Sequence, residues 1–295
     1  MRSAQGYTFG LLIPELGQTE IFEPICRGMA QAQQAEHHAL LWGRSLDDSE
    51  ATASDVTGLC RQLIGKNVSG VFFAPLELTP EKDQINRAIA AEFEKAGIPM
   101  VLLDRDLAIY PERSGFDLVG IDNRRAGYVI TAHLLRSGCG RVIFVGRPRS
   151  APTVDARIAG YREAILDAGL DHRSEFVCRI DPSDTGAVRQ VMNDLGPDGI
   201  VCANDFTAAN LMKTLNELNI VVPDEVRMAG IDDVKYASLL PVPLTTIHQP
   251  CSQIGLTAVE AMVQRLHKPD LPARDILLNF QLVVRQSSGR GERRN

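Results

Sequence analysis

The chain has 295 residues, of which 44% are hydrophobic and 23% charged, a composition typical of a globular protein with about two domains. Its net charge of −6 and pI of about 5.6 argue against a chain that grips nucleic acid through a basic face of its own. The six cysteines form no Cys-x-x-Cys pair, so we expect reduced, buried thiols. No apolar run is long enough to span a bilayer, and residues 1–6 lack the apolar core of a signal peptide. We therefore expect a cytoplasmic protein without a membrane partner.

Short apolar runs alternate with helical patterns along almost the whole chain. Pro80 in a predicted first turn and Gly97 just past the predicted last turn are typical helix punctuation. The alternation breaks at residues 106–117, which we interpret as a loop before a domain crossing. Alternation of this kind implies parallel sheets with right-handed crossovers and helices on both faces. The predicted strands are 7–13, 39–42, 70–73, 100–103, 119–121, 141–145, 176–179 and 275–284, and the predicted helices are 21–36, 55–64, 80–96, 125–136, 156–168, 186–195, 206–218 and 251–266.

Polar side chains follow short apolar runs throughout the stretch 198–249. Apolar runs that end in polar residues are typical of buried strands in a parallel sheet. Ligands of open α/β sheets bind beyond the carboxyl ends of the strands, so we expect Asn204, Asp205, Asp232 and Gln249 to converge on one site. Carboxylates and amides together form a hydrogen-bonding set suited to a polyhydroxyl ligand.

Four segments, in this order and spacing, resemble a known family. They are Cys202–Asp205, Val222–Asp233, Pro243–Pro250 and Leu282–Ser288. Together they resemble the effector-binding core of LacI/GalR-type transcriptional regulators, which share the type I periplasmic binding protein fold. The resemblance extends from residue 7 to about residue 288.

The resemblance implies an α/β fold of two doubly wound parallel-sheet subdomains, joined by a hinge of three crossing strands, with the ligand between them. Family members close on their ligand by a hinge motion, and a dimer passes the change to attached DNA-binding domains. The expected N-terminal subdomain is 7–117 plus 250–277, and the C-terminal one is 118–249 plus 278–288, with tails at 1–6 and 289–295.

The resemblance also assigns the ligand contacts. Asp and Asn side chains suit vicinal hydroxyls, and Arg binds two adjacent oxygens at once. Most of the assigned residues also have a structural alternative. The ligand-binding residues implied are Glu15, Thr19, Phe22, Asp104, Arg105, Arg157 at the opening of a helix, Asn204, Asp232 and Gln249. The alternatives are an Asp104–Arg105 ion pair, a solvated Arg157, a helix N-cap at Asn204 or, more favoured, at Asp205, a hinge role for Gln249, a core role for Phe22 and a structural Asp233.

The sequence departs from the family where a sugar site stacks an aromatic ring on its ligand. Ile21 stands where many sugar binders carry a second aromatic residue, and Ala74 replaces a common polar one. The loop 181–184 offers no ring, and Trp42 is expected to pack rather than to line the site. The effector is therefore a monosaccharide, a sugar acid, a polyol or another small polar molecule.

Motifs of catalysis are missing from the sequence. It contains no Gly-rich nucleotide loop, no Gly-x-Ser-x-Gly and no His-Glu-x-x-His, and its six histidines show no metal-ligand spacing. We therefore expect neither an enzyme nor a cofactor or metal site. We expect the effector-sensing domain of a bacterial transcriptional regulator that controls DNA binding of a homodimer, with operator DNA contacted only through a DNA-binding domain outside this chain. The alternative is a solute-binding protein of a sugar transporter.

Overall fold

The computed structural model describes residues 6–13, 20–36, 38–42, 53–171 and 173–289. The chain divides into two compact units, which are described separately. Unit 1 comprises residues 1–121 and 250–278, and unit 2 comprises 122–249 and 279–295. The chain therefore passes from one unit to the other three times.

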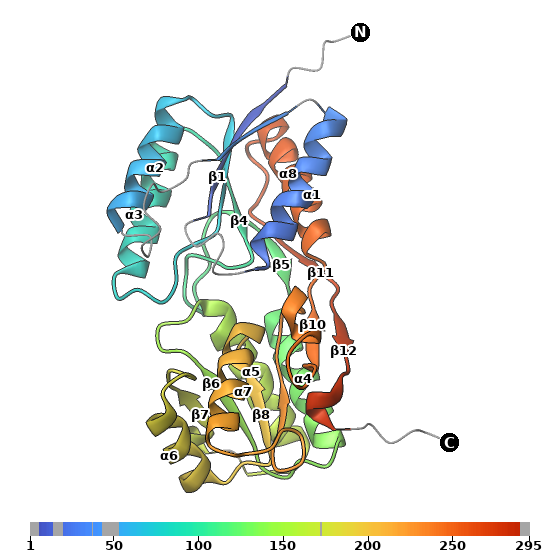
Figure 1. Cartoon of the computed structure of the whole chain (residues 1–295). Helices are drawn as coiled ribbons and strands as arrows, with labels where there is room; N and C mark the ends of the chain where they lie inside the picture. Colours follow the sequence, from blue (N-terminus) through green and yellow to red (C-terminus); the bar gives the residue numbers. More distant parts are fainter. Residues whose placement is uncertain (1–5, 14–19, 37, 43–52, 172, 290–295) are drawn as a thin grey trace. The chain divides into compact units, whose positions relative to one another are not determined.

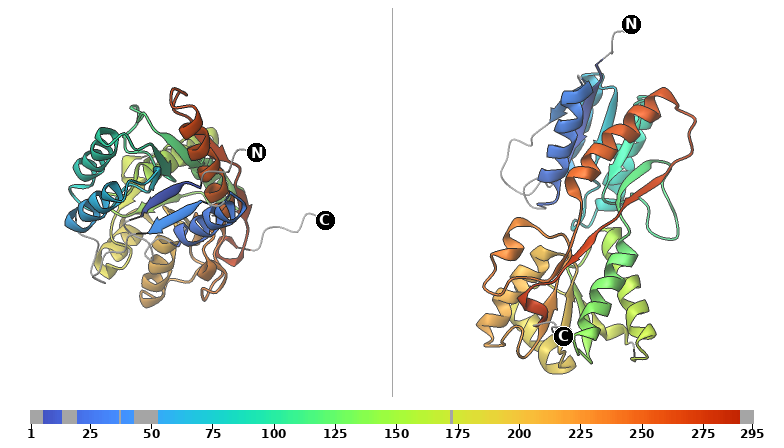
Figure 2. Two further views of the ribbon diagram at one scale, coloured as in Figure 1. Left: turned by 90° about the horizontal axis from the view of Figure 1, so that it is seen from above. Right: turned by 90° about the vertical axis from the view of Figure 1, so that its right-hand side faces the viewer.

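Unit 1 is built on a six-stranded sheet with the order β11-β5-β4-β3-β1-β2, in which every pair is parallel. The central strands β3 and β4 are buried along their whole length, as expected for apolar runs covered on both faces. Helices α1 and α8 pack together on one side of the sheet, and α2 and α3 on the other (Figures 1 and 2). The elements are β1 (Thr8–Leu12), α1 (Phe22–Glu36), β2 (Ala39–Trp42), α2 (Ala53–Gly65), β3 (Gly70–Phe73), α3 (Lys82–Lys95), β4 (Met100–Leu103), β5 (Asp117–Ile121), α8 (Cys251–His267) and β11 (Asp275–Leu278).

Unit 2 repeats this plan with a four-stranded parallel sheet of order β7-β6-β8-β9. Helix α4 packs against α5, and α6 against α7 (Figure 1). A separate antiparallel pair, β10 with β12, belongs to the same unit. The elements are α4 (Asn123–Arg136), β6 (Val142–Gly146), α5 (Pro152–Asp167), β7 (Val177–Arg179), α6 (Thr185–Leu195), β8 (Gly199–Cys202), α7 (Asp205–Glu217), β9 (Arg227–Ala229), β10 (Thr246–His248) and β12 (Gln281–Val283), with 3-10 turns at Ser174–Phe176, Lys235–Ser238 and Gln286–Ser288.

The predicted doubly wound α/β class is confirmed, but several predicted boundaries differ from the structure. The predicted crossing at residue 117 lies at residue 121 instead, because β5 pairs with β4 and β11 in the sheet of unit 1. The single predicted strand 275–284 is two strands, β11 in unit 1 and β12 in unit 2. Helix α5 begins at Pro152, four residues earlier than predicted (152 against 156), because the proline occupies its first turn.

A buried carboxylate organises the strand order at the edge of unit 1. Asp117, at the start of β5, accepts hydrogen bonds from Arg265 Nη2 at 3.0 Å and from Arg274 Nη2 at 3.0 Å. Arg274 also donates its backbone N–H to Asp117 at 2.9 Å. Burial alone raises the pKa of Asp117, but these hydrogen bonds outweigh burial and hold the pKa below its usual value. The carboxylate thus ties α8 and the loop before β11 to β5.

Glycines allow the backbones of α4 and α5 to touch. A Cβ atom at Gly160 would lie 1.8 Å from the carbonyl oxygen of Arg124, and one at Gly127 would lie 2.0 Å from that of Arg157. Neither neighbour is a movable side chain, so no larger residue fits without separating the helices. The same reciprocal pair recurs between α1 and α8, where Gly28 faces Ser252 and Gly255 faces Ile25.

The Gly160→Ala variant tests this close contact. We expect it to lower the free energy of unfolding by about 3 kcal/mol or more, because the added methyl group pushes one backbone off the other. Gly58→Ala in α2 is the matched control, since nothing lies within 4 Å of a Cβ there. That substitution should stabilise the protein by about 0.5–1 kcal/mol through helix propensity alone. Urea denaturation measures both, and equal effects at the two positions would contradict the packing argument.

Candidate functional site

Arg157 lies at the centre of a buried polar cluster in unit 2. Its Nε donates to Asn123 Oδ1 at 2.8 Å, and its Nη1 donates to the carbonyl oxygen of Ala203 at 2.6 Å. Its Nη2 lies 3.6 Å from Asp232 Oδ1. The side chain is 4% exposed and belongs to the second turn of α5, so it is neither solvated nor at the opening of the helix, as the sequence had suggested. The guanidinium links the N-termini of α4 and α7 to the loop after β9.

Asp232 and Gln249 complete the cluster. Gln249 Nε2 donates to Asp232 Oδ1 at 2.7 Å, and the side chain of Gln249 is 1% exposed. Its Oε1 accepts no hydrogen bond from any described residue. A buried acceptor without a donor is costly, so this oxygen calls for a donor from outside the described chain. Beside the hinge position that the sequence offered as an alternative, Gln249 thus has a hydrogen bond to Asp232.

The residues at the start of α7 take different roles from those favoured by the sequence. Asn204 is the N-cap, since its backbone is extended and its Oδ1 accepts from the Thr207 N–H at 2.9 Å. The more favoured cap at Asp205 is wrong: this residue is the first of the helix and is fully buried. The half-buried Asn204 lies just past the carboxyl end of β8 and directly follows Ala203, whose carbonyl oxygen accepts from Arg157.

The neighbouring carboxylate is structural. Asp233 Oδ1 accepts from Arg285 Nη2 at 2.6 Å, and Asp233 Oδ2 lies 2.9 Å from His248 Nδ1. These contacts tie the loop after β9 to β10 and to the segment after β12. The structural alternative that the sequence offered for Asp233 thus describes its contacts.

Unit 1 carries a second polar cluster at the carboxyl end of β4. Arg105 forms an ion pair with Glu77, and its guanidinium carbon lies 5.5 Å from the centre of the Phe22 ring. Asp104 and Arg105 are both buried, and Asp104 adopts a φ of 67°, which is uncommon for a residue with a side chain. Phe22, the first residue of α1, is fully buried. Its ring therefore supports Arg105, as the core alternative implied.

The sequence also singled out Glu15, Thr19, Trp42 and the loop 181–184. Glu15 and Thr19 lie outside the described residues. Trp42 is 54% exposed, so the expected packing role is wrong. In the loop 181–184, Asp184 caps α6 by accepting from two backbone N–H groups.

Two members of these clusters were missed. Asn123 lies two residues after the end of β5, and Glu77 lies four residues after the end of β3. Asn123 thus obeys the strand-end rule that identified Asn204 and Asp232. That rule applied to every strand would have found Asn123, whereas Glu77 lies too far past its strand.

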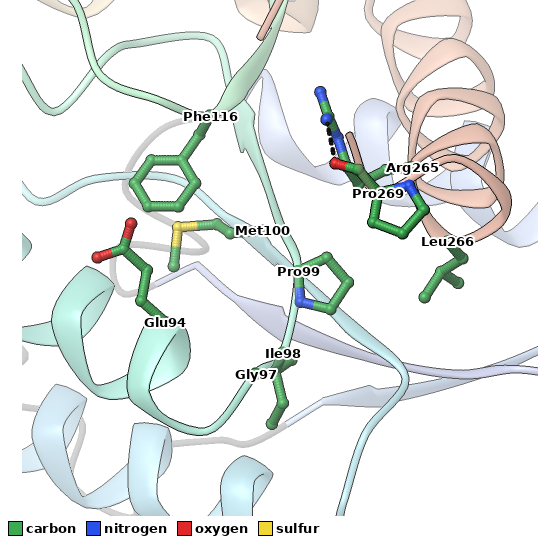
Figure 3. A pocket seen from close by; sticks show the side chains of 9 residues that line it. All are labelled: Glu94, Gly97, Ile98, Pro99, Met100, Phe116, Arg265, Leu266 and Pro269. Carbon is green, nitrogen blue, oxygen red and sulfur yellow. Dashed lines mark hydrogen bonds between the residues drawn. The ribbon is translucent and has the colours of Figure 1, made fainter. Parts of the chain in front are cut away.

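Unit 1 also contains a cavity of about 440 Å³ (Figure 3). Its walls are mainly apolar and include Pro99, Met100 and Phe116. It lies at the amino end of β4, whereas Asp104 follows the carboxyl end of that strand. Arg265 in its wall is engaged by Asp117 and by backbone carbonyl oxygens. The cavity therefore offers no spare cation to a polar ligand.

The described part of the chain lacks two further features. The residues that the structure describes contain no group of three or more His, Cys, Asp or Glu side chains placed to hold a metal ion. In the same part of the chain, no helix combines the length and hydropathy that crossing a membrane requires.

Two α/β units with buried polar side chains at their strand ends define a ligand-binding α/β protein. The chain belongs to the family of periplasmic binding protein-like domains, whose sequence pattern matches residues 131–288. The resemblance to LacI/GalR-type regulators is confirmed by relatives of this chain. It is 28% identical to the HTH-type transcriptional repressor PurR of Photobacterium profundum, over 77% of the chain and 66% of that repressor. The matched part of the chain thus spans just under two thirds of that relative's length.

Two further proteins are similar over nearly the whole chain. The ribose operon repressor of Escherichia coli (strain K12) is 26% identical over 96% of the chain and 83% of the repressor. A LacI family transcriptional regulator from Enterococcus faecalis V583, solved with bound ribose, is 25% identical. It matches with a TM-score of 0.75 over 96% of this chain and 98% of that one.

The Arg157→Met variant tests whether the unit 2 cluster depends on its guanidinium. We expect a loss of about 3–5 kcal/mol in the free energy of unfolding, because the Asp232 carboxylate is left buried without its cation. Arg124→Met is the control, since Arg124 pairs with Glu163 at 2.9 Å on the surface, where an ion pair contributes about 1 kcal/mol or less. Chemical denaturation without added ligand measures both. Near-equal losses would show that Arg157 is not the centre of the cluster.

Proposed function

We propose that the chain is the effector-sensing domain of a bacterial transcriptional regulator and binds a small polar ligand, a monosaccharide or a derivative of one. The observation that carries the proposal is the buried cluster of Arg157, Asp232 and Gln249, in which no described residue donates to Gln249 Oε1. The repressors among its relatives, and the ribose bound in one similar regulator, support the same conclusion.

The chemistry of the cluster suits hydroxyl groups. Each sugar hydroxyl donates one hydrogen bond and accepts others, so one hydroxyl can donate to Gln249 Oε1 and a neighbouring one to the Asp232 carboxylate. Asn204 and, in unit 1, Asp104 and Arg105 are proposed as further effector contacts on the resemblance alone. Bound by such groups, the ligand would be recognised by its hydroxyl pattern rather than by ring stacking.

The regulatory role needs parts that lie outside this chain. We propose that operator DNA is contacted by an attached DNA-binding domain, since the net charge of −6 disfavours DNA binding by the sensing domain itself. The proposed protein acts in the cytoplasm and is not an enzyme. A solute-binding protein of a sugar transporter is the second candidate, but the similar proteins named above are regulators. Coupling requires the effector to bind one conformation more tightly than the other.

The ligand proposal predicts stabilisation by a sugar. In a thermal-shift screen of sugars, sugar acids, polyols and nucleosides, a ligand at a hundred times its Kd should add about 2.7 kcal/mol to the free energy of unfolding. Asp232→Asn should abolish the shift, because it removes an acceptor from the cluster. Asp155→Asn is the control, since Asp155 forms an exposed pair with Arg179. A panel without any hit would reject a sugar-like effector, and a hit that survives Asp232→Asn would place it elsewhere.

We further propose that the chain forms a homodimer through unit 2. Two large apolar side chains are exposed there, Phe206 at 46% and Leu239 at 80%. Their segments are joined, because the Val234 N–H donates to Asp205 Oδ2 at 3.1 Å. Light scattering should show a dimer that Leu239→Lys dissociates, since burying an unpaired ammonium group is costly. Leu166→Lys, at a residue 61% exposed on α5, is the control. A monomeric wild-type protein, or a dimer resistant to Leu239→Lys, contradicts the proposal.

A further inference from the structure

The Asp205 carboxylate joins three elements of unit 2. Its Oδ1 accepts from Thr246 Oγ1 at 2.6 Å, and its Oδ2 accepts from the Val234 N–H at 3.1 Å. Its own N–H donates to the carbonyl oxygen of Ile231 at 2.9 Å. A single buried side chain therefore fixes the start of α7, the loop after β9 and the strand β10 against one another.

The loop that Asp205 holds has an unusual backbone. Asp232 has a φ of 129° and Asp233 a φ of 53°, both in the region that residues with side chains rarely adopt. Such a backbone persists only where surrounding contacts impose it. Here the Asp233 N–H donates to Thr246 Oγ1 at 3.3 Å, and the Asp232 N–H donates to the carbonyl oxygen of Ile247 at 2.9 Å. Thr246 thus connects Asp205 directly to the strained pair.

The fit of the carboxylate is tight. A Cβ atom at Gly230 would lie 2.3 Å from Asp205 Oδ1, so the carboxylate packs directly against the backbone that leads into Asp232. Among the described residues, no cation forms an ion pair with Asp205. Its hydrogen bonds go to the two segments that carry Asp232 and Gln249.

We propose that Asp205 is a positioning residue of the effector site, which imposes the backbone that brings the Asp232 carboxylate to Gln249 and Arg157. The inference rests on the proposed function, because it assumes that Asp232 contacts the effector. It adds a residue that touches no ligand, and it explains how the strained loop is kept in place.

The protonation of Asp205 supports the inference and supplies a readout. The pKa of Asp205 is raised to about 6. Burial is the largest cause and raises the pKa, the hydrogen bonds from Thr246 and Val234 lower it, and the nearby Asp233 raises it. The folded carboxyl group therefore binds its proton more tightly than the unfolded one. Its contribution to stability is complete below the usual carboxyl pKa and is lost as the pH rises through about 6. At pH 8 the charged Asp205 destabilises the fold, so an uncharged replacement should not lower the Tm.

The effect of Asp205 on the pH dependence must be distinguished from the effects of other titratable groups near it. Cys202 precedes α7 and is fully buried, and Asp233 lies on the loop itself. Asp233 in turn faces Arg285 and His248. Because His248 contacts Asp233 directly, a His248→Gln variant is included in every pH series.

The test compares Asp205→Asn with the wild-type protein by three readouts. At pH 8 we expect an unchanged or higher Tm, faster amide hydrogen exchange at residues 232–234, and at least tenfold weaker binding of D-ribose. Asp117→Asn, at the buried carboxylate of unit 1, is the contrast: it should lower the Tm without changing exchange at residues 232–234. If Asp205→Asn does not fold, Thr246→Val removes the shared hydroxyl group and should change exchange in the same direction.

The pH series tests positioning against a merely structural role. Wild-type affinity for D-ribose should fall about tenfold between pH 8 and pH 5, because pH 5 lies about one unit below the pKa of Asp205 and most of its carboxyl groups are then protonated. The fall should persist in His248→Gln and vanish in Asp205→Asn. Unchanged exchange or unchanged ribose affinity in Asp205→Asn overturns the proposal. A wild-type protein that does not bind D-ribose instead rejects ribose as the effector, and exchange at residues 232–234 still decides the positioning role.

Discussion

The polar interior of unit 2 depends on the hydrogen bonds of Arg157. A guanidinium cannot lose its charge inside a protein, so every buried N–H group must meet an oxygen. Three different segments supply those oxygens: Asn123 at the start of α4, Ala203 at the end of β8, and Asp232 after β9. The glycine contact between α4 and α5 sets the distance over which the side chain reaches, because the Arg157 carbonyl itself rests where Gly127 has no side chain. The packing of α4 against α5 therefore also sets the geometry of the polar cluster around Arg157.

Two buried carboxylates show opposite solutions to the cost of burial. Asp117 in unit 1 is surrounded by Arg265 and Arg274, and its pKa is lowered. Asp205 in unit 2 receives only neutral donors, and its pKa is raised to about 6. The first strengthens the fold above its pKa, whereas the second weakens it there. A destabilising carboxylate beside a strained loop is the arrangement expected where geometry at a binding site takes precedence over stability.

The sequence predicted the architecture well because parallel strands buried on both faces are short, uninterrupted apolar runs, and helices carry their own punctuation. Strands β2, β3 and β4 begin and end where the apolar runs do. The break between β11 and β12 was not predictable in this way, since the apolar pattern does not encode which sheet a residue joins. Nor did it reveal that Asn204 rather than Asp205 is the N-cap, because both residue types favour that position and only the backbone distinguishes them.

The site residues divide along the same line. The strand-end rule identified Asn204, Asp232 and Gln249 from the sequence, and it applies equally to the missed Asn123. Arg157 looked like any helix arginine, and only the family resemblance singled it out. Its burial follows from the crossing of α4 and α5, a contact between segments whose glycines, at 127 and 160, are far apart in the chain. Glu77 as the partner of Arg105 arises in the same way, from a loop that returns to the end of β4.

The internal hydrogen bonds of the unit 2 cluster also bear on how it would select a ligand. Arg157, Asn123 and Asp232 already hold one another, so little conformational freedom remains to be lost on binding. The cost that remains is that of Gln249 Oε1, which has no hydrogen-bond partner among the residues that the structure describes. A ligand that donates a hydroxyl group to it removes that cost, whereas an otherwise identical ligand without the hydroxyl leaves a buried acceptor unsatisfied. Sites of this kind reject the deoxy analogue more strongly than apolar pockets reject a missing methyl group. Discrimination would then come from one orphan oxygen more than from the shape of the site.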